Sequence, residues 1–258
     1  MKMFVSERRD TIMDLLKKNK RITVKGLSSK IGVSEATLRT DLNQLEQDGL
    51  LTRTHGGAVL NDTKDEDVSF SVRSKKNKDE KMKIAEEAIH TIKNRQCILL
   101  DGSSTVLELA RYISKEPLKL TVVTSGLQTA IELKENPDIT VILIGGVASK
   151  GSSAIEGTLG IDLLDQVNID TMYTSANGFT IENGLTDFNL YEVSLKREMI
   201  KRADKVVALI DSSKIGAISS AVFAQTEEID ILITDKSLPE EIIEKPLLKD
   251  IEVIISNN

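Results

Sequence analysis

The sequence is poor in the residues that metal and disulfide chemistry require, with one cysteine and two histidines among 258 residues. Cys97 cannot form an internal disulfide, which favours a reducing compartment, and the apolar run CILL predicts that it packs as a small buried hydrophobe. His55 and His90 have no cysteine or histidine spaced for a shared metal. We therefore expect neither a zinc site nor a Ser-His-Asp triad, and no catalytic residue is assigned.

Long hydrophobic runs are missing as well. No apolar stretch approaches the roughly 18 residues that a membrane helix needs, and the N-terminus MKMFVSERRD lacks the apolar core of a signal peptide. The sequence therefore predicts a cytoplasmic protein with no membrane partner. Its length and its 40% hydrophobic content suit one large domain or two unequal domains.

Charge is divided unevenly along the chain. Residues 1–60 hold eleven Lys or Arg against seven Asp or Glu, whereas the remainder holds 23 against 33. A basic head on an acidic body favours a polyanionic partner for the head. On charge alone, an ordinary solvated surface is an equally good interpretation.

Three short amphipathic helices are predicted in the head. Apolar residues recur at helical spacing in SERRDTIMDLLKKNK and in VKGLSSKI, and the second helix has Thr23 as its N-cap and Gly32 as a left-handed end. A third helix, with Ser34 as its N-cap, turns its leucines inward and leaves a small polar face outward. That face and its flanks carry the candidate DNA contacts Ser34, Ala36, Thr37, Arg39, Thr40 and Asn43.

The tight turn before the third helix is typical of a helix-turn-helix, whose last helix is narrow enough for the major groove of DNA. Arg39 is the expected base reader, because a guanidinium can donate two hydrogen bonds to one guanine edge. From the helices alone, a bundle that displays an inert polar face is the alternative.

The next segment, LLTRTHGGAVL, predicts two short strands around a turn in which Gly56 and Gly57 adopt positive φ. The tip of such a wing lies against the DNA backbone, so Arg53 and His55 are candidate phosphate contacts. Alternatively, His55 only forms a hydrogen bond across the hairpin.

The segment LSSKIGVSEATLRTDLNQLEQDGLLTRTHGGA resembles the winged-helix signature of the DeoR family of bacterial transcriptional regulators. The resemblance covers the turn, the third helix and the wing in one register, and it implies a regulator that binds double-stranded operator DNA. Thr40 is a departure, because the family usually has a second arginine there. The polar, charge-rich segment NDTKDEDVSFSVRSKKN then predicts a linker over residues 61–77, between a DNA-binding domain at 1–60 and an effector domain at 78–258.

In the acidic body, the seven apolar runs CILLD, LTVVT, ITVILIG, IDTMYTSA, KVVALID, DILITD and IEVIIS alternate with helical stretches. This pattern predicts an α/β fold with a mostly parallel sheet that is covered on both faces. Most runs finish in small polar residues or glycine, at the sheet edge where open α/β sheets bind ligands. Taken singly, each such end is better explained by a cap or a turn, but five such ends on one sheet edge favour a binding site.

The segment DGSST is the best candidate anion site, because it offers three hydroxyls and free backbone amides at the start of a helix. Lys214 could supply a positive charge, and Asp101 and Asp211 could accept sugar hydroxyls or hold that lysine. Neither the dinucleotide fingerprint nor the P-loop appears, so no cofactor is expected, and a phosphorylated small molecule remains.

Several of these segments, among them ILLDGSST, LTVVTSGLQTAIEL, NGFTIENGLT and KVVALIDSSKIG, also look like the DeoR-type effector domain, whose fold is related to ribose-5-phosphate isomerase. The resemblance implies a sugar-phosphate pocket lined by Asp101, Ser103, Ser104, Thr105, Asn177, Gly178, Glu192, Lys196, Asp211 and Lys214. From their spacing alone, Glu192 and Lys196 would form a surface salt bridge.

These observations together predict a DNA-binding regulator, a repressor of a carbohydrate uptake or catabolism operon, controlled by a phosphorylated sugar. Two operator half-sites would require a homodimer or a homotetramer. The main alternative is a sugar-phosphate isomerase or deaminase that uses the same carboxylates and amines. The sequence does not distinguish repression from activation.

Overall fold

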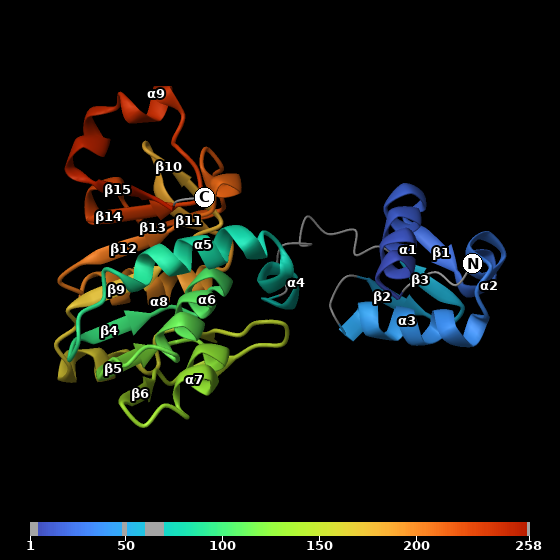
Figure 1. Ribbon diagram of the computed structural model, residues 1–258, viewed down its shortest axis with the longest axis horizontal. Coiled ribbons are helices and arrows are strands. Elements are labelled where there is room, and N and C mark those ends of the chain that lie inside the picture. The colour runs from blue at the N-terminus through green and yellow to red at the C-terminus, as the bar shows by residue number, and fades with distance from the viewer. Residues whose placement is uncertain (1–4, 48–50, 60–69, 257–258) are drawn as a thin grey trace. The chain divides into compact units, whose positions relative to one another are not determined.

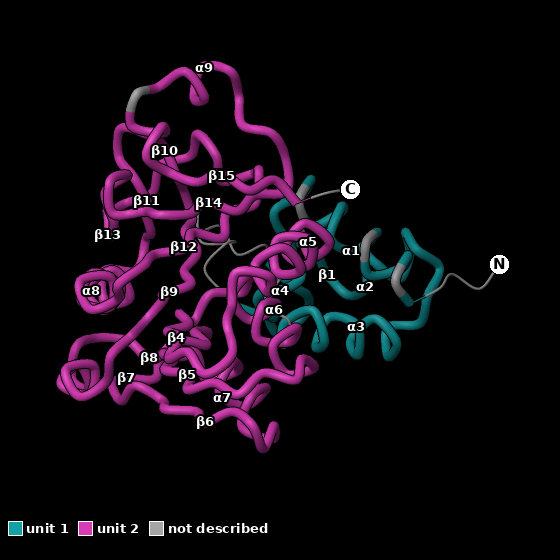
Figure 2. Tube along the Cα trace, turned by 60° about the vertical axis from the view of Figure 1, so that its left-hand side comes forward, with its two compact units in different colours: residues 1–76 teal, residues 77–258 magenta. Residues whose placement is uncertain are grey.

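The computed structural model describes residues 5–47, 51–59 and 70–256. The chain divides into two compact units, residues 1–76 and residues 77–258 (Figure 2). Within the described part of the chain, no helix is long and apolar enough to cross a membrane.

In the first unit, the described residues up to Val59 combine three helices with a small antiparallel sheet (Figure 1). These elements are α1 (Val5–Asn19), β1 (Arg21–Thr23), α2 (Val24–Ile31), α3 (Glu35–Gln47), β2 (Thr52–Thr54) and β3 (Gly57–Val59). The strand order is β1-β3-β2, so the predicted hairpin is present and gains a third strand. Strand β1 has only three residues, too few to reveal an alternating pattern in the sequence. The predicted winged helix-turn-helix is confirmed.

Capping interactions set the bounds of α2 and α3 as predicted. Thr23 Oγ1 accepts a hydrogen bond from the backbone N–H of Gly26 at 3.0 Å, and Gly32 ends α2 with a left-handed φ of 71°. Ser34 Oγ accepts from the N–H of Thr37 at 3.3 Å, at the start of α3. These bonds satisfy amides that the first turn of a helix leaves without partners.

A single apolar core joins the three helices. Leu38, Leu42 and Leu45 of α3 are at most 3% exposed and belong to the same cluster as Ile12 and Leu16 of α1. Burial of each such side chain contributes about 1.5–3 kcal/mol, which outweighs the marginal stability of isolated short helices. Because this face of α3 is buried, its polar face is left outward.

The expectation that Gly56 and Gly57 adopt positive φ is wrong, because neither residue belongs to the glycines in that region. Gly57 serves a different purpose. It pairs with Thr23 across β1 and β3, and a Cβ atom built on it would lie 1.9 Å from the backbone oxygen of Ile22. The glycine therefore permits close approach of two strands rather than an unusual backbone conformation.

Helix α4 (Phe70–Lys75) occupies the second part of the segment that was expected to be a linker. None of its side chains is fully buried. Residues 60–69, the first part of that segment, lie outside the described residues. Six residues with no apolar stripe give little helical signal in the sequence, which is why this helix was not predicted.

Seven parallel strands form the main sheet of the second unit, in the order β15-β14-β12-β9-β4-β5-β6. They are β4 (Cys97–Leu100), β5 (Leu120–Thr124), β6 (Ile139–Leu143), β9 (Thr171–Thr174), β12 (Val206–Leu209), β14 (Ile231–Thr234) and β15 (Glu252–Ile255). Each strand lies in one of the seven apolar runs. The predicted mostly parallel α/β sheet is confirmed.

Helices cover both faces of this sheet, as the continuous apolar runs require. On one face, Leu100 packs in a cluster with residues of α5 (Lys78–Ile89) and α6 (Ser104–Ile113), which Figure 1 shows in front of the sheet. On the other face, Leu99 packs with residues of α8 (Leu190–Ile200). Cys97 is half-buried and packs against this second cluster.

Shorter elements surround the carboxyl edge of the main sheet, and most of them were not predicted. An antiparallel sheet has the order β10-β11-β13, and β7 pairs with β8. Their bounds, with those of the remaining helices, are β7 (Val147–Ala148), β8 (Ile155–Glu156), β10 (Gly178–Thr180), β11 (Gly184–Asp187), β13 (Ala221–Ala224), α7 (Leu127–Leu133) and α9 (Glu240–Ile243). Short 3-10 turns lie at Ile161–Gln166, Ser212–Lys214, Thr226–Glu228 and Pro246–Asp250.

The packing of β1 on β3 predicts that Gly57→Ala destabilises the first unit. The new methyl group would overlap a backbone oxygen that cannot move without breaking the strand pair, at a cost of roughly 1–3 kcal/mol. The matched control is Gly56→Ala, because no atom lies within 4 Å of a Cβ at that position. Denaturant unfolding followed by circular dichroism measures both variants, and equal stabilities would contradict the packing argument.

Candidate nucleic-acid interface and effector site

The polar face of α3 is open to solvent. Ala36, Arg39, Thr40 and Asn43 are all exposed, and Thr37 is half-buried. Because these side chains share one helix face, they can meet the edges of neighbouring bases together.

The guanidinium of Arg39 is pre-positioned by its own helix. Its side chain is 58% exposed, and Nη2 lies 2.9 Å from Oε2 of Glu35, one turn earlier in α3. An exposed i, i+4 pair is worth at most about 1 kcal/mol, so a nucleic acid can displace it at low cost. Ser34, also exposed, caps the same turn.

The two candidate phosphate contacts of the wing, Arg53 and His55, differ in their exposure to solvent. His55 is exposed at the turn between β2 and β3. Arg53 is half-buried, and its Nη1 atom is enclosed with no hydrogen-bond partner among the described residues. Its backbone N–H donates to Oε1 of Glu46 at 2.8 Å, which ties the wing to the end of α3. A buried guanidinium donor without a partner is costly.

A buried ion pair orients the recognition helix, and the sequence analysis missed it. Asp41 of α3 is 2% exposed, and its carboxylate accepts from Arg8 of α1 at 2.5 and 3.2 Å. Arg9 lies 3.5 Å from the same carboxylate. The hydrogen bond to Asp41 raises the pKa of Arg8 above its usual value, with burial opposing it. Asp41 lies on the leucine side of α3, so helical spacing alone could have singled it out.

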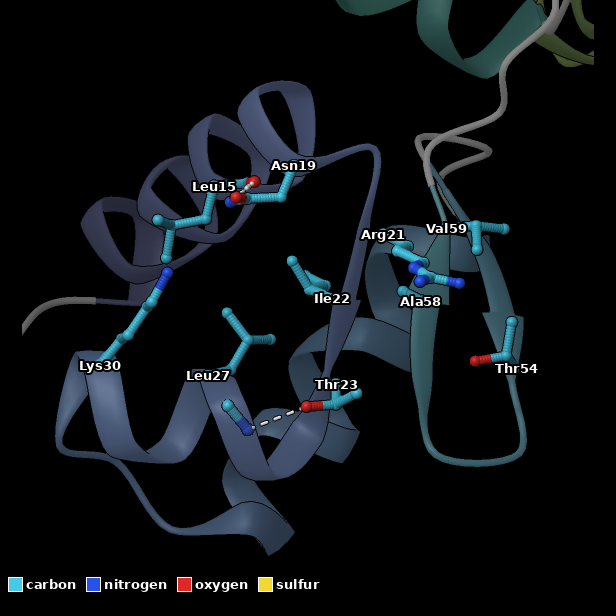
Figure 3. A pocket seen from close by; sticks show the side chains of 11 residues that line it. Leu15, Asn19, Arg21, Ile22, Thr23, Leu27, Lys30, Thr54, Ala58 and Val59 are labelled. Carbon is cyan, nitrogen blue, oxygen red and sulfur yellow. Dashed lines mark hydrogen bonds between the residues drawn. The ribbon is translucent and has the colours of Figure 1, made fainter.

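The first unit also contains a hollow of about 590 Å³, which lies between α1, α2, β1 and the wing (Figure 3). Leu15, Ile22 and Leu27 form part of its lining, together with Arg21 and Lys30. None of the eight predicted DNA contacts lines it. The hollow is therefore separate from the exposed face of α3.

In the second unit, Lys196 is the centre of a buried polar cluster at the carboxyl edge of the sheet. Its Nζ lies 3.2 Å from Oδ2 of Asp101, 3.0 Å from Oδ2 of Asp187 and 2.8 Å from the backbone oxygen of Ser175. It also lies 4.6 Å from the centre of the Phe223 ring. Three segments distant in the sequence, the ends of β4, β9 and β11, therefore meet at one ammonium group.

Asp101 is fully buried, and its carboxylate is saturated by partners. It accepts from the N–H groups of Ser103 and Ser175 at 2.9 and 3.1 Å and from Oγ1 of Thr174 at 2.7 Å. Burial by itself raises the pKa of Asp101, but Lys196 and these hydrogen bonds lower it below its usual value. Burial likewise lowers the pKa of Lys196, but Asp101, Asp187 and Glu192 raise it above its usual value. Both groups are therefore charged in the fold.

Glu192 and Lys196 do not form the surface salt bridge that their spacing allowed, because they are 6% and 4% exposed. Glu192 Oε1 accepts from Nδ2 of Asn189 at 3.2 Å, and the same nitrogen donates to Oε1 of Glu156 at 3.0 Å. Glu156 is also buried. Three carboxylates, those of Asp101, Asp187 and Glu192, thus interact with a single buried lysine, and the helical spacing of α8 could not have revealed this.

Three of the other residues predicted to line the pocket lie at the cluster or close to its members. Asn177 joins the cluster, because its Nδ2 donates to Oδ1 of Asp187 at 2.9 Å. Thr105 is buried and accepts from Oγ of Ser175 at 3.3 Å, and Ser104 is buried beside it. These positions follow directly from the parallel sheet, which brings all strand ends to one edge.

Ser103 and Gly178 have local structural roles in addition. Ser103 Oγ caps α6 by accepting from the N–H of Val106 at 3.3 Å. Gly178 is buried where a Cβ would lie 2.4 Å from the backbone oxygen of Ala217. The glycine therefore allows close packing of β10 on the segment after β12.

Asp211 and Lys214 stand apart from the Lys196 cluster. Asp211 Oδ1 accepts from Nδ2 of Asn77 at 3.0 Å and from the N–H of Ser213 at 3.1 Å. Asp101 pairs with Lys196 rather than with Lys214, contrary to one option that the sequence left open. Lys214 is half-buried in a short 3-10 turn.

Residues of the cluster also line a small hollow beside β8 and α8. It is too narrow to admit a water molecule, and its lining includes Gly102, Ser125, Ile155, Glu192 and Lys196. Pockets that hold drug-sized ligands measure roughly 300–1,000 Å³. No group of three or more His, Cys, Asp or Glu side chains in the described residues is arranged to hold a metal ion.

Comparison with known families agrees with both units. Residues 8–64 match the DeoR-like helix-turn-helix domain, and residues 76–236 match the DeoR C terminal sensor domain. Because the second match alone spans more than half of the chain, the protein belongs to the DeoR family of DNA-binding transcriptional regulators. This membership decides against the isomerase or deaminase alternative, since the family consists of regulators rather than enzymes.

Individual relatives align along nearly the full length. The HTH-type transcriptional regulator GolR of Listeria innocua is 47% identical over 94% of this chain and 95% of its own. The HTH-type transcriptional repressor GlcR of Bacillus subtilis is 34% identical over 91% and 90%. Among solved structures, ribose 5-phosphate isomerase A of Methanocaldococcus jannaschii matches with a TM-score of 0.41 at 19% identity, over 54% of this chain and 55% of that chain.

The buried cluster predicts that Lys196→Met strongly destabilises the second unit. The substitution leaves Asp101 and Asp187 without their cation, which costs about 3–5 kcal/mol when one partner of a buried pair is removed. The control is Lys201→Met, which removes an exposed pair with Glu198 and should cost less than about 1 kcal/mol. Urea unfolding of both variants tests the difference, and similar losses would show that the buried pair carries no special weight.

Proposed function

We propose that this regulator represses a carbohydrate uptake or catabolism operon and that a phosphorylated sugar controls its affinity for the operator. The observation that carries the proposal is the carboxylate and lysine cluster beside the first turn of α6, in a unit joined to a winged helix-turn-helix. The printed name of the relative GlcR, a repressor, supports repression, whereas a relative of similar identity in Haemophilus influenzae is printed as an L-fucose operon activator.

On the DNA side, α3 would enter the major groove with Arg39 at a base edge and Thr40 and Asn43 beside it. Arg53 and His55 would meet the phosphate backbone from the wing. The positive charge of Arg53 and its place on the wing support this assignment.

On the effector side, the two ends of a sugar phosphate suit different parts of the site. The backbone amides at the start of α6 favour the phosphate group. Buried carboxylates such as Glu192 and Asp187 are acceptors that sugar hydroxyls can use. Asp101 has its acceptor positions filled, so we assign it the role of holding Lys196 and the β4–α6 turn in place.

The small volume of the hollow supports a regulatory mechanism. The hollow does not admit even a water molecule, so binding of a ligand of sugar-phosphate size would have to move β8 or the start of α8. An effector that binds one conformation better than another shifts DNA affinity by that difference in binding free energy. Two heads on adjacent half-sites would require a homodimer or a homotetramer.

Two arginine substitutions separate base reading from backbone binding. Arg39→Ala should relax preference at one base pair, worth about 1–3 kcal/mol, and should leave binding to non-operator DNA nearly unchanged. Arg53→Ala should weaken binding to every sequence and reduce the salt slope by up to about one unit. Fluorescence anisotropy on operator and scrambled DNA at several salt concentrations measures both effects. If neither variant changes operator affinity, α3 and the wing do not contact DNA as proposed.

A thermal-shift panel of phosphorylated sugars tests the effector site. A ligand at a hundredfold excess over its dissociation constant stabilises the folded protein by about 2.7 kcal/mol. Lys214 stands apart from the Lys196 cluster, but the resemblance to the DeoR-type effector domain implies that it lines the sugar-phosphate pocket. Lys214→Ala should therefore remove the shift and the change in operator affinity while operator binding itself persists. Lys236→Ala, an exposed lysine after the neighbouring strand β14, is the control and should respond as wild type. An unchanged shift in Lys214→Ala would exclude Lys214 from the site.

A further inference from the structure

The hollow of the first unit, between α1, α2, β1 and the wing, has the size and lining of a small-molecule site. Its volume of about 590 Å³ falls within the roughly 300–1,000 Å³ that ligand pockets occupy. The apolar side chains that line it are Leu15, Ile22, Leu27, Ala58 and Val59. Leu15 and Ile22 pack against the core of this unit yet are only half-buried, so the hollow leaves apolar surface in contact with water.

The lining residues share one face of each element that carries them. Leu15 and Asn19 lie one turn apart in α1, and Leu27 and Lys30 lie three residues apart in α2. Strand β1 pairs with β3 along its full length, so the side of the hollow that the sheet forms is continuous as well. The hollow is therefore one site and not a group of separate surface residues.

Positive charge flanks the apolar floor of this hollow on two sides. Figure 3 shows Lys30 on one side and Arg21 on the other, with Ile22 and Leu27 between them. Both cationic side chains are exposed, and neither has an ion-pair or hydrogen-bond partner among the described residues. In the same part of the chain, no Asp or Glu lines the hollow. Its lining is thus complementary to a molecule that is both apolar and negatively charged.

We propose that the hollow of the first unit binds an amphipathic organic anion, a small molecule with an apolar ring or chain and one acidic group. The apolar part covers Ile22 and Leu27, and the acidic group lies against Lys30 or Arg21. An inorganic anion would leave the apolar floor in water, and a neutral hydrocarbon would leave both cations without a partner. The inference concerns the first unit, and it does not depend on the sugar phosphate proposed for the second.

The location of this site has a consequence for DNA binding. Thr54 lines the hollow from β2, and its neighbours in the chain are the candidate phosphate contacts Arg53 and His55. An anion bound here also cancels part of the positive charge that the first unit presents to the phosphate backbone. We therefore expect occupation of the hollow to weaken binding to operator and scrambled DNA alike.

Fluorescence titration of the full chain with anilinonaphthalene sulfonate tests the proposal, because this amphipathic anion becomes emissive on apolar surface. Wild type should bind it saturably. Lys30→Glu and Arg21→Glu should each raise its dissociation constant at least about fivefold, since each reverses one charge at the rim. Lys25→Glu is the matched control, because Lys25 is exposed on the same helix but does not line the hollow. It should stay within about twofold of wild type.

Phenylnaphthylamine, the same ring system without the sulfonate, separates charge from apolar contact. It should bind wild type more weakly than the sulfonate does and should bind all three variants equally. Because the substituted side chains are exposed, circular dichroism should show cooperative, wild-type melting for each variant, which excludes dye binding to a loosened fold. Absence of saturable sulfonate binding would overturn the proposal, as would rim variants that bind the sulfonate as Lys25→Glu does.

A mobility-shift assay with the sulfonate at saturation tests the consequence for DNA. Wild type should lose at least about twofold in affinity for operator and scrambled duplexes, and Lys30→Glu should lose less at the same sulfonate concentration. Unchanged wild-type affinity would refute control of DNA binding from this site. No sugar is present in either assay, so these outcomes are independent of whether a phosphorylated sugar acts on the second unit.

Discussion

The second unit depends on one buried cation. The ammonium of Lys196 holds the ends of three strands together through Asp101, Asp187 and the backbone of Ser175. A carboxylate as enclosed as Asp101 would be strongly unfavourable alone, and the pair is tolerable only because hydrogen bonds satisfy its remaining acceptor positions. The same requirement makes the cluster sensitive to any ligand that offers new partners. A site built in this way can be stable when empty and still respond to binding.

The first unit uses a similar device for a different purpose. Asp41 lies on the buried side of α3 and is held by Arg8 from α1, so the rotation of the recognition helix is coupled to the helix behind it. Burial of the leucines on the same face stabilises the packing of α3, and the ion pair fixes the rotation of α3 about its own axis. Because α3 cannot rotate without breaking this pair, its polar face stays outward. Orientation of that face is what a major-groove contact requires.

The DNA-binding face and the candidate effector site lie in separate compact units. A regulator therefore requires that effector binding in one unit changes the DNA affinity of the other. The hollow at the Lys196 cluster does not admit a water molecule, so the proposed sugar phosphate could bind there only if β8 or α8 moves. Movement of either element would carry the effect of binding beyond the cluster itself.

Much of this protein follows from its sequence by itself. Helical spacing of Leu38, Leu42 and Leu45, the caps Thr23 and Ser34, and seven apolar runs predicted the winged helix-turn-helix and the parallel sheet, because these signals depend on residues close together in the chain. Tertiary structure alone decided that Gly57 permits strand approach, that Asp41 is an anchor and that Asp187 joins Lys196. Each of these roles depends on an atom from a segment distant in the sequence, and local periodicity carries no information about such a partner.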